Sequence, residues 1–102
     1  METCNKIVRN NIPDILKSMG KKFEVENLDK DSALEFLYLN LISTIYDGLE
    51  SKSLDDIIES IDLLVEIGKE YGYTDDEISN QRNIIRKEKG DFSKKLFLKN
   101  TY

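Results

Sequence analysis

Four carboxylates follow one side of the helix predicted over about residues 54–72. Their spacings of four, three and four residues stack the side chains along one helix face, in the order Asp55, Glu59, Asp62 and Glu66. Mg²⁺ takes near-octahedral oxygen ligands and keeps water or phosphate oxygens in several positions, so Glu59 and Asp62, one turn apart, are candidate ligands for one ion. The alternative interpretation is a solvated helix face, on which this spacing is common.

Metal chemistry in this chain is restricted to hard ions with oxygen ligands. The sequence has no histidine and a single cysteine, Cys4. Zinc sites, Ser-His-Asp triads and Cys-His nucleophiles are therefore excluded for a single chain. Cys4 cannot form an intramolecular disulfide, which fits a reducing compartment, and we assign it no role.

The charge is unevenly distributed along the chain. The formal net charge of −5 argues against binding to long nucleic acids. Acids dominate from Asp47 to Glu77, whereas most charged residues from Arg82 to Lys99 are basic. An acidic part followed by a basic part fits a phosphate ligand bridged by a metal, and helix faces solvated by charge are the alternative interpretation.

Helices must position these side chains, and the sequence marks their ends. Pro13 favours a first helical turn and Gly20 a left-handed helix end. Asp31 or Ser32 is the predicted N-cap of a long helix whose apolar residues recur every three or four positions. Capping boxes that start at Ser53 and Thr74 open two more helices. The predicted helices cover about residues 12–19, 32–50, 54–72 and 75–89, with an extended connector at 23–26 and a tail at 91–102.

These elements predict an all-α fold in one domain, residues 1–102, as an antiparallel helical bundle. The long helix also carries apolar residues away from its main face, which favours completion of the bundle by a homo-oligomer, a dimer or a tetramer. No apolar run reaches the roughly 20 residues that span a bilayer, and Met1 to Asn5 lack the pattern of a signal peptide. We therefore expect no membrane contact and a cytoplasmic location.

Three motifs together resemble one family. Residues 6–13, KIVRNNIP, resemble the opening KLVRDKIP signature of a compact MazG-like group, and residues 89–98, KGDFSKKLFL, resemble its KRGGFxxRIFL segment. The central helices supply acids in the order of its EExxE and ExxD motifs. By these motifs the chain is similar to the MazG-like, phosphoribosyl-ATP pyrophosphohydrolase-like superfamily of all-α nucleotide pyrophosphohydrolases.

The resemblance implies Mg²⁺ bound by the acidic motifs and hydrolysis of a nucleoside triphosphate to the monophosphate and pyrophosphate. Glu59 and Asp62 match ExxD, and Asp47 matches the last acid of EExxE. Ser43 and Thr44 stand where the family has paired glutamates, and neutral hydroxyls bind Mg²⁺ far less well. Charged signature positions are also replaced by Asn10 and Asn11. Mg²⁺ binding is therefore expected to be possible but weakened, and no catalytic residue is assigned.

The residues expected to bind a nucleotide are better preserved, relative to the family motifs, than the residues expected to hydrolyse it. Phosphate contacts are predicted for Lys6, Arg9, Lys94 and Lys95, with Arg9 the better fork for paired oxygens. The predicted ligand pocket comprises Asn10, Asn11, Ser43, Thr44, Tyr46 and Phe92. The alternative interpretation is that the cations are ordinary surface charges and that the aromatic side chains pack in the core or at an interface.

The leading functional hypothesis is a protein that binds a nucleotide or a nucleotide-derived signal with little or no hydrolysis, and so sequesters it. Its basis is the loss of acids at Ser43 and Thr44. The first alternative is an active Mg²⁺-dependent nucleoside triphosphate pyrophosphohydrolase that uses Asp47, Glu59 and Asp62. The second is a helical protein-interaction module that uses the apolar surface of the central helices.

Overall fold

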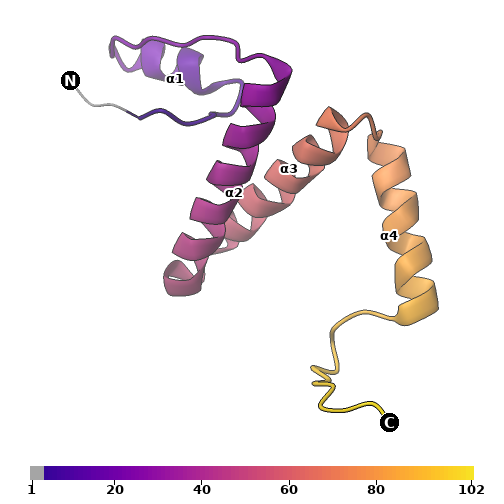
Figure 1. Cartoon of the computed structure of the whole chain (residues 1–102). Helices are drawn as coiled ribbons and strands as arrows, with labels where there is room; N and C mark the ends of the chain where they lie inside the picture. The colour runs from indigo at the N-terminus through magenta and orange to yellow at the C-terminus, as the bar shows by residue number, and fades with distance from the viewer. Residues whose placement is uncertain (1–3) are drawn as a thin grey trace.

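The computed structural model describes residues 4–102. Residues 1–3 lie outside the described residues. They are part of the segment for which we expect no signal peptide. Within 4–102 the chain forms four helices and no strand: α1 (Ile12–Ser18), α2 (Lys30–Ser51), α3 (Leu54–Glu70) and α4 (Asp75–Lys89) (Figure 1). The predicted all-α fold class is confirmed, and residues 23–26 form a connector.

The start of α2 differs from the prediction. Asp29, and not Asp31 or Ser32, is the N-cap, because its Oδ1 accepts a hydrogen bond from the Ser32 backbone N–H at 2.8 Å. Asp31 lies in the first turn, where an acidic side chain interacts favourably with the helix dipole. The prediction of the cap was therefore wrong by two or three residues, while the helix itself was placed correctly.

The other predicted caps are present. The Ser53 hydroxyl accepts from the Asp56 N–H at 3.1 Å, and Thr74 and Glu77 form a reciprocal capping box. The third helix ends at Glu70, slightly before the predicted Gly72. Gly90, at a φ of 83°, ends α4 as expected.

The helices α2 and α3 form an antiparallel pair that contains the core (Figure 1). Four side chains are buried between them: Leu37, Leu41, Leu63 and Ile67. Two partly buried side chains, Ile7 and Leu34, pack against this cluster. The hydroxyls of Tyr38 and Tyr71 lie 2.7 Å apart and join the two helices near one end, which raises the pKa of Tyr71. The core is small, so the pair leaves much apolar surface exposed.

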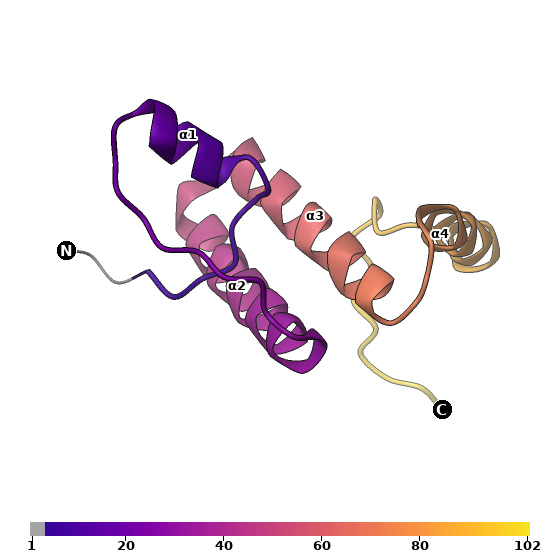
Figure 2. The same ribbon diagram turned by 90° about the horizontal axis from the view of Figure 1, so that it is seen from above.

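The fourth helix leaves this pair. A Cβ atom at Gly68 would lie 2.9 Å from the Ile78 Cδ1 atom, so α4 packs closely on α3 near its start. Beyond that contact α4 projects away, and the C-terminal tail continues past its far end (Figure 1). Seen from above, α1 and α4 lie on opposite sides of the α2–α3 pair (Figure 2). Within one chain, the predicted antiparallel packing is therefore found mainly between α2 and α3.

No described helix is long and apolar enough to cross a bilayer.

Substitution of glycine by alanine should have opposite effects on stability at Gly48 and Gly20. A Cβ at Gly48, inside α2, would make an ordinary contact of 3.7 Å with Asp56, so Gly48→Ala should raise the free energy of unfolding by about 0.5–1 kcal/mol. Gly20 has a φ of 74°, which disfavours a Cβ, so Gly20→Ala should lower it by about 1 kcal/mol. Urea titration of both variants checks the prediction, and equal signs would contradict it.

The N-cap Asp29 predicts a pH dependence of stability. The hydrogen bond from Ser32 holds the pKa of this carboxyl below its ordinary value. Its contribution is therefore fully present above the pKa of the unfolded chain, about 3.9, and is lost as the pH falls through the lower folded pKa. Asp29→Asn keeps a cap acceptor but cannot titrate. Urea titrations at pH 5 and pH 3 should show a larger loss of stability in the wild type than in this variant, and equal losses would contradict the assignment.

Candidate functional site

Three predicted site residues meet on the surface of α3. The Arg9 Nε atom lies 3.2 Å from Glu59 Oε1, and the Arg9 Nη1 atom lies 2.8 Å from Asp62 Oδ2. All three side chains are about half exposed. The hydrogen bond with Asp62, followed by the charge of Glu59, raises the pKa of Arg9, so the guanidinium stays charged over the working pH range. We call these residues the Arg9 cluster.

The segment before α1 positions Arg9. The Asn40 side-chain amide, on α2, donates a hydrogen bond to the Ile7 carbonyl at 2.7 Å, and the Ile7 side chain packs against the core. The Arg9 carbonyl accepts from the Ile12 N–H at 3.0 Å, which turns the chain into α1. Arg9 is therefore held over α3 from both sides. Asn40 is a positioning residue that sequence reasoning missed, because a single amide on a mostly apolar helix gives no distinct signal.

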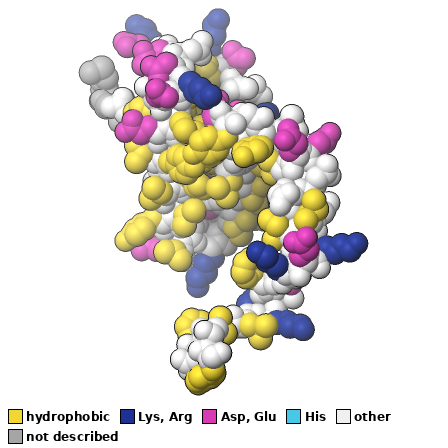
Figure 3. Space-filling model, turned by 45° about the vertical axis from the view of Figure 1, so that its right-hand side comes forward, with side chains coloured by type: hydrophobic (Ala, Val, Ile, Leu, Met, Phe, Trp, Pro, Cys, Tyr) yellow, Lys and Arg dark blue, Asp and Glu magenta, His cyan; other side chains and the backbone are white. Residues whose placement is uncertain are grey.

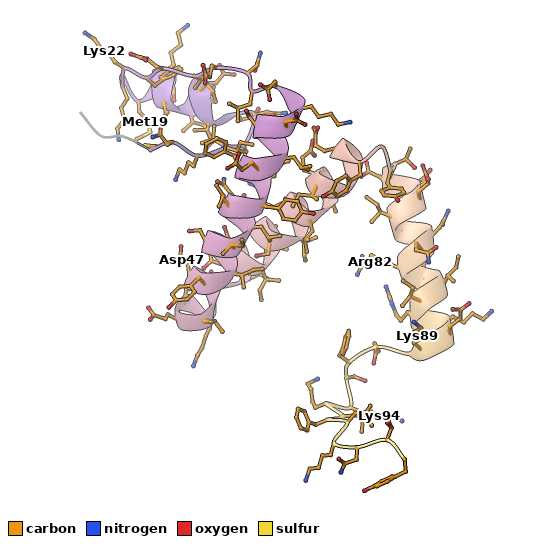
Figure 4. The ribbon with its side chains drawn as sticks, in the orientation of Figure 1. Met19, Lys22, Asp47, Arg82, Lys89 and Lys94 are labelled. Carbon is orange, nitrogen blue, oxygen red and sulfur yellow. The ribbon has the colours of Figure 1, made fainter. Side chains whose placement is uncertain are left out.

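The predicted metal ligands are brought together only in part. Spacings of three and four place Ser43 and Asp47 on the same face of α2 as Asn40. Figure 4 shows Asp47 on the half of α2 far from α1. Asp47 is exposed, and none of the ion pairs within residues 4–102 includes it.

The Arg9 cluster does not fit a resident metal ion as it stands. Both carboxylates that would bind Mg²⁺ already pair with a guanidinium, so an ion would have to displace Arg9. In the described part of the chain no group of three or more acidic, histidine or cysteine side chains is arranged to hold a metal.

The tail residues lie apart from the Arg9 cluster. Figure 4 shows Lys94 in the tail beyond α4, on the other side of the molecule from α1. The Lys95 ammonium donates to the carbonyls of Phe92 and Ser93, and the Phe92 side chain is exposed. A single chain therefore does not bring the tail cations to Arg9. Near Arg9, three further predicted residues are exposed on the surface: Lys6, Asn10 and Asn11.

An apolar groove runs between α2 and α3. Its volume is about 320 Å³, and it is lined by Thr44, Ile45, Gly48, Leu49, Asp56, Ile57, Ser60, Ile61 and Leu64. Figure 3 shows hydrophobic side chains gathered over the central body of the molecule and again in the tail. We call this feature the α2/α3 groove. Thr44, a predicted pocket residue, lines it, whereas Tyr46 is exposed outside it.

One guanidinium nitrogen of the Arg9 cluster has no partner among residues 4–102. Nε and Nη1 contact the carboxylates, and the hydrogen bonds formed by residues 4–102 do not use Nη2. Nη2 can donate to one phosphate or carboxylate oxygen of a ligand, while the other two nitrogens hold the guanidinium in place. Comparison of the chain with protein-family models, curated proteins and solved structures found no match, so the MazG-like resemblance stays a prediction from the three motifs.

Proposed function

We propose that this chain binds a nucleotide or a nucleotide-derived signalling molecule on a MazG-like scaffold, with little or no hydrolysis. The observation that supports this most is the position of Arg9, which two carboxylates hold with one guanidinium nitrogen left for a ligand. A preoriented guanidinium loses less freedom when it binds a phosphate, which favours affinity.

The charge of the Arg9 cluster indicates the form in which the ligand binds. Two carboxylates and one guanidinium leave a net charge of −1, which repels a free polyphosphate. A nucleotide that carries Mg²⁺ on its phosphates has less negative charge to bring to this surface. The proposal is therefore that Mg²⁺ enters with the ligand, while the chain itself binds the ion weakly.

Weak hydrolysis follows from the same residues. Metal ions speed phosphate-ester hydrolysis when they neutralise developing charge and orient the attacking water. Here Ser43 and Thr44 supply hydroxyls at the positions of two family glutamates, and Glu59 and Asp62 pair with Arg9. Sequestration of an intact ligand fits this set of residues better than turnover.

A homo-oligomer is part of the proposal. Large apolar side chains along α2 and α3 stay exposed, among them Ile45, Leu49, Ile57 and Ile61. A second copy could cover them.

A protein-interaction module is the second candidate, and the α2/α3 groove is the observation that favours it. The groove is lined mainly by aliphatic side chains and has an acidic residue, Asp56, but no cation. Such a surface fits an apolar protein segment and not a phosphate. In this second case the chain would bind another protein without any nucleotide.

A thermal-shift screen separates the two functions. The probes are nucleoside mono-, di- and triphosphates and cyclic nucleotides with and without Mg²⁺, and the matched controls are the corresponding nucleosides. A ligand at 100 times its Kd adds about 2.7 kcal/mol and should raise the Tm of a domain of this size by about 10 °C. A rise with one nucleotide but not with its nucleoside supports the proposal. No rise with any probe contradicts it and favours the interaction module.

A further inference from the structure

The α2/α3 groove is lined mainly by aliphatic side chains and by no cation, so an apolar segment is the occupant that matches it best. Its large aliphatic side chains are about half exposed or more: Leu49 73%, Ile57 55%, Leu64 54%, Ile45 52% and Ile61 47%. Contiguous exposed apolar side chains on a soluble protein can mark an interaction site. Asp56 lines the groove, and Glu50, Lys52 and Asp55 lie close to Asp56 in the sequence, so this stretch carries a net negative charge. The matching occupant is an apolar segment with basic flanks.

The tail of this chain has that composition. Leu96, Phe97 and Leu98 are 86%, 85% and 77% exposed, which leaves three large side chains in water. Lys94 and Lys95 precede them and Lys99 follows them. In an extended segment Leu96 and Leu98 project to the same side, so they can enter one groove together. Apolar character and charge therefore both match the tail to the groove.

The groove and the tail are apart within one copy. The α4 helix departs from α3 after its first contact, and the tail continues beyond the far end of α4 (Figure 1). A second copy can supply the tail without any change in the path of α4. If each copy gives its tail to the other, the two contacts are related by a twofold axis and the assembly closes as a dimer.

We propose that residues 94–99 of one copy dock in the α2/α3 groove of a second copy. Leu96 and Leu98 enter the groove between α2 and α3, and the flanking lysines lie near the acids at the start of α3. This inference rests on the self-association in the proposed function and specifies which segment makes the contact. It does not depend on nucleotide binding.

Disulfide trapping between two different single-cysteine proteins tests the contact. Both proteins carry Cys4→Ser to remove the exposed native thiol. One also carries Leu98→Cys in the tail, and the other carries Leu49→Cys in the groove. The matched control pair is Asn100→Cys with Leu39→Cys, which lies on α2 outside the groove. The proteins are mixed, oxidised and separated on non-reducing gels, with mass spectrometry to identify the joined peptides.

The expected result is a 98–49 disulfide in the mixture, formed at least tenfold faster than the control disulfide. A 49–49 disulfide without the 98–49 product would overturn the tail contact and would show that two grooves pack face to face. Absence of both products, together with a monomer mass in sedimentation, would overturn the tail contact and self-association together. The nucleotide screen is unaffected by these outcomes, so failure of ligand binding is read separately.

Sedimentation of tail variants gives a second measure in the full chain. The double variant Leu96→Asp, Leu98→Asp should raise the dimer dissociation constant at least about 100-fold, since each leucine loses its burial in the groove. The control Asn100→Asp, Thr101→Asp adds the same charge to the tail outside the apolar segment and should change it less than about threefold. Equal effects of both variants would overturn the proposal. The tail lies outside the buried core, so neither variant should unfold the chain.

Discussion

Replacing Arg9 by glutamine should weaken nucleotide binding by about 10- to 100-fold, the range expected for loss of a hydrogen bond between a charged donor and a phosphate. The variant removes the guanidinium that Glu59 and Asp62 hold in place. Arg9→Lys keeps the positive charge but loses the fork, so an intermediate affinity is expected. Isothermal titration with the nucleotide found in the screen measures both values.

The matched control for Arg9 is Arg82→Gln. Arg82 lies on α4 (Figure 4), whereas the acids of the Arg9 cluster lie on α3, so loss of Arg82 should leave affinity within about twofold of the wild type. The buried residues are elsewhere, so circular dichroism should show the same helix content in all variants. An unchanged affinity in Arg9→Gln would contradict the assigned role. A gain of Mg²⁺-dependent turnover would show instead that Arg9 blocks a working metal site.

Introducing the paired glutamates of the MazG-like EExxE motif with Ser43→Glu and Thr44→Glu should create Mg²⁺-dependent release of pyrophosphate. The two residues lie on α2 before Asp47, and Ser43 shares a face with Asn40, which contacts the segment that carries Arg9. New carboxylates would bind Mg²⁺ and stabilise the charge that develops on the phosphates. The expected gain in rate is at least about 100-fold over the wild type, which is the usual size of one such electrostatic contribution.

The control for this gain is Ser43→Gln with Thr44→Gln. Glutamine matches glutamate in size but carries no charge, so this variant should stay as inactive as the wild type. Adding Glu59→Ala to the glutamate variant should remove the new activity, because Glu59 would be one of its metal ligands. A glutamate variant with no activity toward any nucleotide would argue against a degraded pyrophosphohydrolase site.

Most helix ends were predictable because they depend on neighbours in the sequence. The cap at Ser53, the capping box at Thr74 and the helix end at Gly90 involve residues at most four apart, and each is present. The start of α2 was misplaced because Asp29, Asp31 and Ser32 are all good N-caps. Which of them caps the helix depends on the path of the preceding connector, and local propensity does not define that path.

The Arg9 cluster was predictable only in its parts. Arg9 was assigned to phosphate and the acid pair to magnesium, from separate motifs 50 residues apart. Their direct pairing depends on how the segment before α1 crosses α3, and that crossing is set by the Asn40 hydrogen bond and by Ile7 in the core. The position of the tail was likewise beyond sequence patterns, because it depends on where α4 leaves α3.

The most direct test of the central claim is isothermal titration of the purified wild-type chain with the screened nucleotide and Mg²⁺, with chromatography of the ligand afterwards. The expected result is saturable binding at a fixed ratio of ligand to chain and recovery of the nucleotide intact. Conversion of the nucleotide to its monophosphate with release of pyrophosphate over repeated turnovers would contradict it. That result would favour the active Mg²⁺-dependent pyrophosphohydrolase.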